Sequence, residues 1–207
     1  MDTIIKLMIR HRMDSKIALG MIIFVAISAI IFFSCSPLKP AAEFSADIEI
    51  SMPDSLLKGK IYVDGYHYRI DIDDGLETIS VIVNQKAGMT YILLQSEKAC
   101  SYMESDSPAS IENDPFQAIR FHSDSGDKIF LSEDKVDSFL CAKSEIKNGD
   151  SVFTVWESSE LGFPLQIEQS QGNAKTKLEN ISIKEIPESL FTIPEDYIIM
   201  MNRWRNR

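Results

Sequence analysis

Apolar and polar residues alternate with a period of two along most of the chain from Phe44 onward. In "GKIYVDGYHYRIDIDDG", residues 59–75, two alternating runs flank the pair Asp64-Gly65. A D-G pair between alternating runs predicts a β-hairpin, because glycine readily adopts the positive φ that a tight turn requires. The second run places four apolar side chains on one face of its strand, namely Tyr66, Tyr68, Ile70 and Ile72.

The same pattern recurs downstream, with short turns between the alternating runs. The predicted strands include "TISVIVN", "MTYILLQ", "ACSYME", "VDSFLCAKSEIK", "SVFTVWES", "FPLQIEQS" and "AKTKLENISI". Within "FPLQIEQS", Phe163, Leu165 and Ile167 share one face. Roughly nine or ten strands joined as sequence neighbours form a meander, so the chain is predicted to be mainly β, with a strongly curved antiparallel sheet.

Residues 105–127, "SDSPASIENDPFQAIRFHSDSGD", interrupt this series of strands. Asp114 followed by Pro115 is typical of a helix start, with the aspartate as N-cap and proline at the first helical position. The sequence therefore predicts a short helix over residues 115–121, with Phe116 and Ile119 on one face. Long connections in compact domains are often functional covers, so we expect these two side chains to act as a lid. A disordered insertion is the alternative.

The first 34 residues have a different composition. Four basic residues precede the uncharged apolar run from Ile17 to Phe33, which ends at Ser34 and Cys35. Basic, apolar and small residues in this order are typical of an export signal. The end of the run resembles a bacterial lipobox, which predicts cleavage between Ser34 and Cys35 and lipidation of Cys35. An uncleaved anchor or an ordinary signal peptide stays open, as does a start at Met13.

These boundaries divide the chain into a lipoprotein signal peptide at 1–34, a tether at 35–43, a β domain at 44–199 and a basic C-terminal tail at 200–207. Because residues 1–34 hold four of the 21 basic and two of the 31 acidic residues, the remainder carries a net charge of −12. Such a surface repels phosphate backbones, which argues against nucleic-acid binding. The membrane, reached through the lipid anchor, is the expected partner.

Two cysteines remain in the exported part, Cys100 and Cys141. In an oxidising compartment two leftover cysteines suggest a disulfide, and we predict that they are bonded. The alternative is two separate buried thiols that behave as small apolar side chains.

The exported part lacks the common signatures of catalysis. Its two histidines, His67 and His122, are 55 residues apart, and its glycines form no phosphate-binding loop. The acidic turn "DIDDG" does not have the spacing of a calcium loop. No nucleophile, base and orienting group can be assembled from the sequence, so we expect no enzyme activity, no catalytic residue, no cofactor and no metal.

Four segments together resemble the LolA/LolB-like group of bacterial envelope proteins. They are "GKIYVDGYHYRIDI", "ISVIVNQKAGMTYILLQSEKACSYM", "VWESSELGFPLQIEQ" and "PESLFTIPEDY". The resemblance spans most of the exported part. More narrowly, these segments resemble a family of lipoprotein domains with this fold. It implies an incomplete, half-open antiparallel barrel that encloses an apolar cavity for acyl chains, with no catalytic residue.

We expect such a cavity to be lined by the apolar faces of the strands. Its lining residues are Tyr66, Tyr68, Ile70, Ile72, Phe163, Leu165 and Ile167. Lipidation of Cys35 predicts a protein anchored in the cell envelope, and Ser36 after the cysteine favours the outer membrane, facing the periplasm. The implied protein binds lipid or lipoprotein acyl chains as a tethered receptor, chaperone or sensor. The alternative is an anchored interaction protein whose barrel is filled by its own side chains, because the same residues serve a packed core.

Overall fold

The computed structural model describes residues 41–73, 75 and 77–200. The predicted signal peptide, the cleavage site at Ser34 and Cys35, most of the tether and residues 201–207 lie outside these residues. The first strand begins at Ala41, so residues 41–43, assigned to the tether from the sequence, belong to the sheet.

The described residues form strands and short helices in a simple order along the chain. They are β1 (Ala41–Met52), β2 (Ser55–Gly65), β3 (His67–Asp73), β4 (Thr78–Asn84), β5 (Met89–Leu94), β6 (Ala99–Glu104), α2 (Pro108–Asn113), α3 (Pro115–Ser125), β7 (Asp127–Val136), β8 (Phe139–Asn148), β9 (Ser151–Ser158), β10 (Phe163–Gln169), β11 (Ala174–Ile183), η1 (Glu188–Phe191) and β12 (Ile198–Met200).

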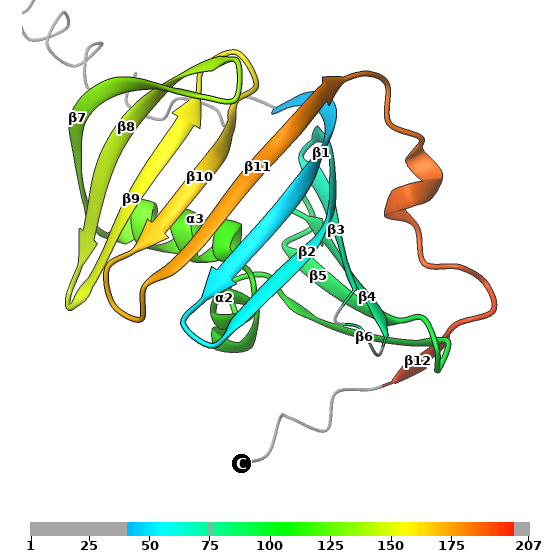
Figure 1. Ribbon diagram of the computed structural model, residues 1–207. Coiled ribbons are helices and arrows are strands. Elements are labelled where there is room, and N and C mark those ends of the chain that lie inside the picture. The colour runs from blue at the N-terminus through cyan, green and yellow to red at the C-terminus, as the bar shows by residue number, and fades with distance from the viewer. Residues whose placement is uncertain (1–40, 74, 76, 201–207) are drawn as a thin grey trace, which may run out of the picture. The chain divides into compact units, whose positions relative to one another are not determined.

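Among the described residues, all twelve strands belong to one open sheet with the order β12-β6-β5-β4-β3-β2-β1-β11-β10-β9-β8-β7. The sheet consists of two antiparallel meanders, β1 to β6 and β7 to β11. They are joined where β1 pairs with β11, for example at Ile48 and Leu178. Figure 1 shows the sheet bending so that α2 and α3 lie against one face, here called the inner face. The predicted mainly β, largely antiparallel meander is thus confirmed.

Several elements were not predicted from the sequence, among them β7, α2, β12 and η1. Strand β7 carries consecutive apolar residues, Ile129, Phe130 and Leu131, and a register shift between Phe130 and Ser132 breaks the alternation. Helix α2 precedes α3, which is longer than predicted and ends at Ser125. Strand β12 is three residues long and pairs in parallel with β6. Short or non-alternating segments give no periodic signal, so pattern alone could not identify them.

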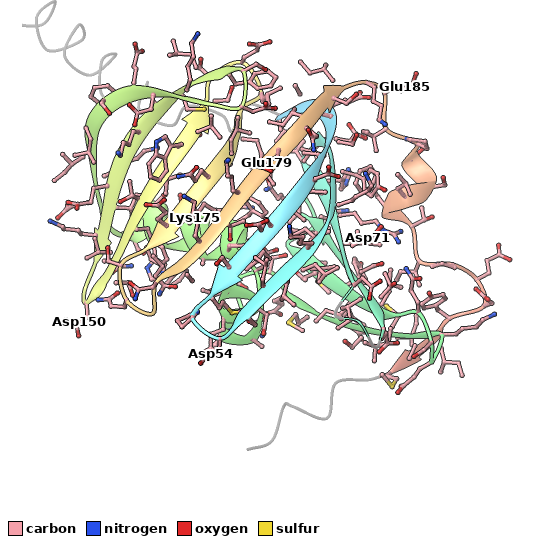
Figure 2. The ribbon with its side chains drawn as sticks, in the orientation of Figure 1. Asp54, Asp71, Asp150, Lys175, Glu179 and Glu185 are labelled. Carbon is pink, nitrogen blue, oxygen red and sulfur yellow. The ribbon has the colours of Figure 1, made fainter. Side chains whose placement is uncertain are left out.

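Opposite faces of the sheet differ sharply in chemistry. Alternate residues of β1, Phe44, Ala46 and Ile48, are buried in the main core on the inner face. The outer face of the neighbouring strands carries ion pairs, such as Lys175 with Glu168 at 2.9 Å. Figure 2 shows Lys175 and Glu179 on the face of β11 that points away from the helices. This division follows from the period-two pattern of the sequence.

Part of the outer face is covered by the chain that follows β11, residues 184–200, here called the C-terminal strap. The guanidinium of Arg69 on β3 donates to the carbonyl of Leu190 at 3.0 Å, and the amine of Lys98 contacts Asp196 at 2.6 Å. Under the strap lies a second, smaller core that includes Leu93 and Cys100. The strap therefore covers part of the outer face of β4 to β6.

Candidate functional site

The inner face is closed by an aromatic junction between the sheet and α3. The ring of Phe116 on α3 lies 4.8 Å from the ring of Phe163 on β10 and 5.7 Å from that of Tyr68 on β3. Phe163 also meets Phe44 on β1, with ring centroids 5.7 Å apart. One residue from the helix thus bridges strands from both meanders.

Most residues expected to line a cavity are instead packed into one buried cluster. The cluster contains Tyr68, Ile70, Phe163, Leu165 and Ile167, the lid residues Phe116 and Ile119, and Ile72 as a partly buried neighbour. The sequence correctly placed these side chains on a common face. In the structure that face is in contact with α3, which covers it.

Tyr66 is the exception among the predicted lining residues. It lies between β2 and β3, with Gly65 at φ +57° beside it, and is not part of the core. Its ring is covered by the amine of Lys86 at 5.0 Å. The prediction for Tyr66 was wrong because the two-residue turn is Gly65-Tyr66 and not Asp64-Gly65, as the pairing of Asp64 with His67 shows.

A buried polar contact holds the start of α3 to the sheet. The hydroxyl of Tyr68 donates to Oδ2 of Asp114 at 2.6 Å and accepts from Nε2 of Gln117 at 3.1 Å. Asp114 is also the N-cap of α3, since its Oδ1 accepts from the backbone N–H groups of Phe116 and Gln117. We call Tyr68, Asp114 and Gln117 the latch.

Burial dominates the electrostatics of the latch. Desolvation raises the pKa of Asp114 to about 6, although the bonds from Tyr68 and from the helix N–H groups act in the opposite direction. The pKa of Tyr68 is also raised well above its usual value, first by burial and then by the charge of Asp114. The latch therefore contains a carboxyl group, that of Asp114, which is shielded from water.

Helix α2 is attached to the sheet by hydroxyl groups. Thr90 on β5 shares hydrogen bonds with Ser105 at 2.9 Å and with Ser110 on α2 at 3.1 Å, and all three residues are buried. Ser107 caps this helix by accepting from the N–H of Ser110. The segment from Ser105 to Gln117 therefore contacts the sheet through polar groups, both at α2 and at the start of α3.

The far end of α3 is held differently, by close backbone contact with β8. A Cβ atom on Gly126 would lie 2.5 Å from the carbonyl oxygen of Lys147, so only glycine allows this approach. Next to it, the side-chain amide of Asn148 donates to the hydroxyl of Ser125 at 2.7 Å. Backbone contact at one end and side-chain contacts at the other favour a pivot near Gly126.

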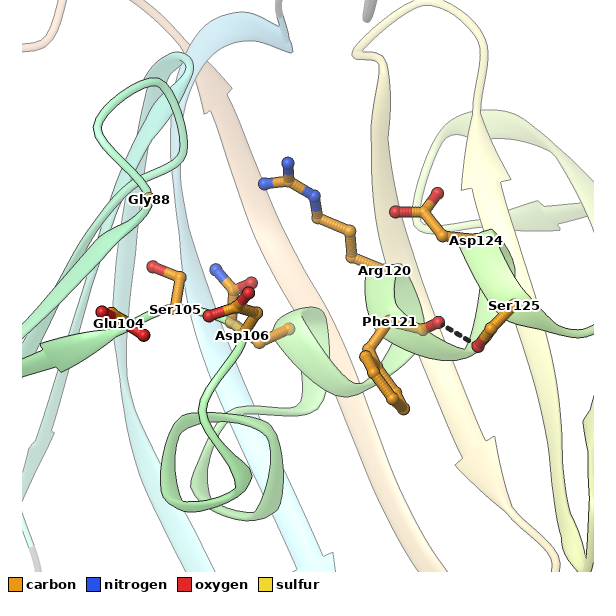
Figure 3. Close-up of a pocket in the computed structure, with 9 residues that line it drawn as sticks. Gly88, Glu104, Ser105, Asp106, Arg120, Phe121, Asp124 and Ser125 are labelled. Carbon is orange, nitrogen blue, oxygen red and sulfur yellow. Dashed lines mark hydrogen bonds between the residues drawn. The ribbon is translucent and has the colours of Figure 1, made fainter. Parts of the chain in front are cut away.

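A pocket of about 540 Å³ lies beside α3, at the edge of the latch. Figure 3 shows Arg120 and Asp124 extending from α3 into it, with Glu104, Ser105 and Asp106 on the other side and Gly88 in the adjacent turn. Gln117 belongs both to this wall and to the latch. The latch therefore lies between the apolar inner face and a pocket with charged residues in its wall.

The predicted disulfide is wrong. Cys100 and Cys141 are free, buried thiols. Cys100 lies on β6 in the small core under the strap, and Cys141 lies on β8 in the main core. Eight strands separate β6 from β8 in the sheet order, so the thiols cannot meet. Burial raises the pKa of both, which keeps them protonated.

Within residues 41–73, 75 and 77–200, no group of three or more His, Cys, Asp or Glu side chains is placed to hold a metal ion. No helix in these same residues is long and apolar enough to span a membrane. His122 has a buried Nδ1 atom without a hydrogen-bond partner among the described residues, and its ring packs on Phe153 at 4.9 Å.

Comparison with known proteins identifies the fold and leaves the activity open. An uncharacterized conserved protein from Thermus thermophilus matches with a TM-score of 0.56 and 11% identity, over 78% of this chain and 91% of that one. MucB, in the Pseudomonas aeruginosa MucA/MucB complex, matches with a TM-score of 0.51 and 15% identity, over 79% of this chain and 59% of that one. The fold is LolA-like.

A third structure, PNGF-II, matches this LolA-like fold with a TM-score of 0.51 and 10% identity, over 78% of this chain and only 31% of that one. The chain thus spans less than two thirds of MucB and of PNGF-II. No protein-family model matches the sequence, and no curated protein matches it significantly. The resemblance to the LolA/LolB-like group, drawn from strand and turn patterns, is confirmed at the level of the fold.

The latch and the pocket were not predicted from the sequence. Asp114 was recognised as an N-cap, but its partner Tyr68 is 46 positions away and was assigned to a cavity wall. Arg120 gave no signal, because a single arginine on a short helix is usually a solvated residue. Only the fold brings Arg120 and Asp124 beside Glu104 and Asp106.

Proposed function

We propose that this protein is a lipid-anchored envelope protein that binds acyl chains of lipids or lipoproteins on the inner face of its sheet, with α2 and α3 as the lid. The observation that carries the proposal is the latch. An apolar sheet face is covered by a helix whose start is held by three polar side chains, one of which is a carboxyl group of raised pKa. Separating the helix from the sheet at such a polar contact costs less free energy than separating purely apolar surfaces of equal area.

Packing of the inner face fits a closed state. With the lid shut, Phe116 and Ile119 occupy the space in front of Phe163 and Leu165. Rotation of α3 about its Gly126 end would withdraw Phe116 and expose a continuous apolar surface that joins the pocket. An acyl chain would replace the contacts of the withdrawn ring, and each buried methylene contributes about 0.8 kcal/mol.

The proposed location follows from the N-terminal segment. Lipidation of Cys35 after cleavage at Ser34 would hold the β domain at a membrane of the cell envelope, and we assign it to the outer membrane on its periplasmic side. Two or more acyl chains make such anchoring stable, so the protein would act as a tethered receptor, chaperone or sensor and not as a shuttle. The proposal includes no catalysis and no cofactor.

Replacing Cys35 by serine is expected to abolish incorporation of a labelled fatty acid into the protein, because the serine hydroxyl cannot take the place of the thiol in the thioether bond. Metabolic labelling of cells that express the full-length chain measures this, with Cys100→Ser as the matched control that should keep the label. Label retained by the Cys35 variant would refute the assigned anchor.

Binding of a fluorescent long-chain fatty acid to residues 36–207 tests the proposed ligand. The described residues from Ala41 onward belong to one compact unit, which supports the use of this fragment. We expect saturable binding that is displaced by unlabelled fatty acid and not by a short-chain acid. Absence of saturable binding would remove the acyl-chain assignment.

The second candidate function is an anchored protein-interaction module with a solid core. It is favoured by β7, an edge strand with Ile129, Phe130 and Leu131 exposed at 50%, 62% and 49%. An exposed apolar edge can pair with an extended segment of another protein. MucB, which shares the fold, is seen in complex with MucA. Failure to bind fatty acid, with the domain folded, would favour this function.

A further inference from the structure

The pocket beside α3 contains charges of both signs that do not neutralise one another. Arg120 and Asp124 come from the helix, and Glu104 and Asp106 come from the end of β6 and the turn after it. None of these four side chains forms an ion pair with another described residue. The side chain of Glu104 turns away from Arg120, on the same face of β6 as Cys100 and Tyr102. Two carboxylates, those of Asp106 and Asp124, and the guanidinium of Arg120 therefore lie around the same space without an ion-pair partner among the described residues.

From this arrangement we infer that the pocket binds a zwitterionic headgroup with a primary ammonium and a phosphodiester, as in phosphatidylethanolamine. Arg120 would pair with the phosphodiester, since a guanidinium matches phosphate oxygens with two parallel donors. The carboxylates of Asp106 and Asp124 would accept from the ammonium. A purely anionic headgroup would satisfy Arg120 but would meet two negative charges.

The position of the pocket relative to the latch supports a headgroup and not an unrelated small molecule. Gln117 lines the pocket and donates to the Tyr68 hydroxyl, so one side chain separates the charged groups from the apolar inner face. A diacyl lipid whose chains enter beneath the open lid would leave its headgroup at this edge. Phe121, which is 44% exposed, lines the same pocket and can cover the glycerol region.

This inference rests on the proposed acyl-chain function. Binding of the headgroup without its chains tests the pocket independently of acyl-chain binding. Full-length protein, purified in a non-ionic detergent and stripped of lipid, is titrated with dihexanoyl phosphatidylethanolamine and dihexanoyl phosphatidylglycerol, which share their chains. Glycerophosphoethanolamine provides the headgroup without chains. We expect about a tenfold preference for the phosphatidylethanolamine, because a charge-assisted contact is gained and a repulsion is avoided.

Two variants assign the preference to the pocket. Arg120→Gln should weaken binding of both lipids about tenfold, because both carry the phosphodiester. Asp124→Asn should weaken the phosphatidylethanolamine and strengthen the phosphatidylglycerol, so that the preference falls to about threefold or less. Lys58→Gln on β2, which removes a positive charge paired with Glu49 outside the pocket, is the matched control and should leave both affinities unchanged.

Equal affinity for the two lipids would overturn the headgroup site while leaving acyl-chain binding intact. Preference retained in both pocket variants would overturn it as well, because the discrimination would then lie elsewhere. Binding of glycerophosphoethanolamine that is lost in Arg120→Gln would support the headgroup site even if no acyl chain binds. Failure of all three compounds to bind would overturn the headgroup site, and titration with the long-chain fatty acid would then decide separately whether the acyl-chain function stands.

Discussion

Phe163→Ala is expected to lower the free energy of unfolding by about 3–5 kcal/mol, the largest effect of any single change considered for the β domain. Phe163 is 5% exposed, and its ring contacts rings from the lid and from two other strands, those of Phe116, Tyr68 and Phe44. Truncation would remove three edge or tilted ring contacts and leave a cavity beneath α3.

Urea unfolding of residues 36–207 measures this effect, with Phe130→Ala as the control. Phe130 is 62% exposed on β7, so its truncation should change the free energy of unfolding by no more than about 0.5 kcal/mol. A loss below about 1.5 kcal/mol for Phe163→Ala would mean that the inner face is not packed against the lid in solution. The closed state described above would then be incorrect.

Asp114 is expected to make the stability of the domain depend on pH in an unusual direction. Its pKa is raised from 3.8 to about 6 by burial, so the folded protein binds this proton more tightly than the unfolded chain does. The stabilisation by the bound proton is complete below about pH 4 and is lost as the pH rises through about 6. The difference of roughly two pKa units corresponds to about 3 kcal/mol.

Comparison with Asp114→Asn isolates this contribution, because other titrating groups cancel. Asparagine keeps an N-cap acceptor for Phe116 and Gln117 but carries no charge. The free energy of unfolding of the variant, measured relative to the wild type, should rise by up to about 3 kcal/mol between about pH 4 and pH 8. A difference that stays constant with pH would show that Asp114 does not titrate in an apolar site.

The parts of the fold that the sequence predicted are those with local signals. The strands on both sides of Gly65 and the side-chain alternation of β3 followed from period and turn residues. Asp114 and Pro115 correctly marked the start of α3. In each case the deciding residues are neighbours in the sequence, and their preferences act before any tertiary contact forms.

Features set by distant contacts could not be predicted in this way. The two cysteines were paired because both lie in an exported chain, but the β1–β11 junction places their strands at opposite parts of the sheet. Tyr68 was assigned to a face correctly, yet its role depends on the hydroxyl meeting Asp114 across the lid. Strand β7 has consecutive exposed apolar residues, which violate the alternation on which strand prediction depends.

The central claim is that α3 is a lid held by the latch, and Tyr68→Phe tests it most directly. The change keeps the ring of the inner face and removes the hydroxyl that joins Asp114 and Gln117, so a larger fraction of molecules should have the lid open. Apparent affinity rises in proportion to that fraction. Loss of a hydrogen bond to a buried carboxyl group corresponds to about a tenfold change.

The measurement is titration of residues 36–207 with a fluorescent long-chain fatty acid, for the wild type, Tyr68→Phe and Tyr62→Phe. Tyr62 lies on β2 with its side chain on the other face of the sheet from Tyr68, and it serves as the matched control. We predict about tenfold tighter binding by Tyr68→Phe and no change in Tyr62→Phe. Unchanged or weaker binding by Tyr68→Phe, in a variant that remains folded, would contradict the lid.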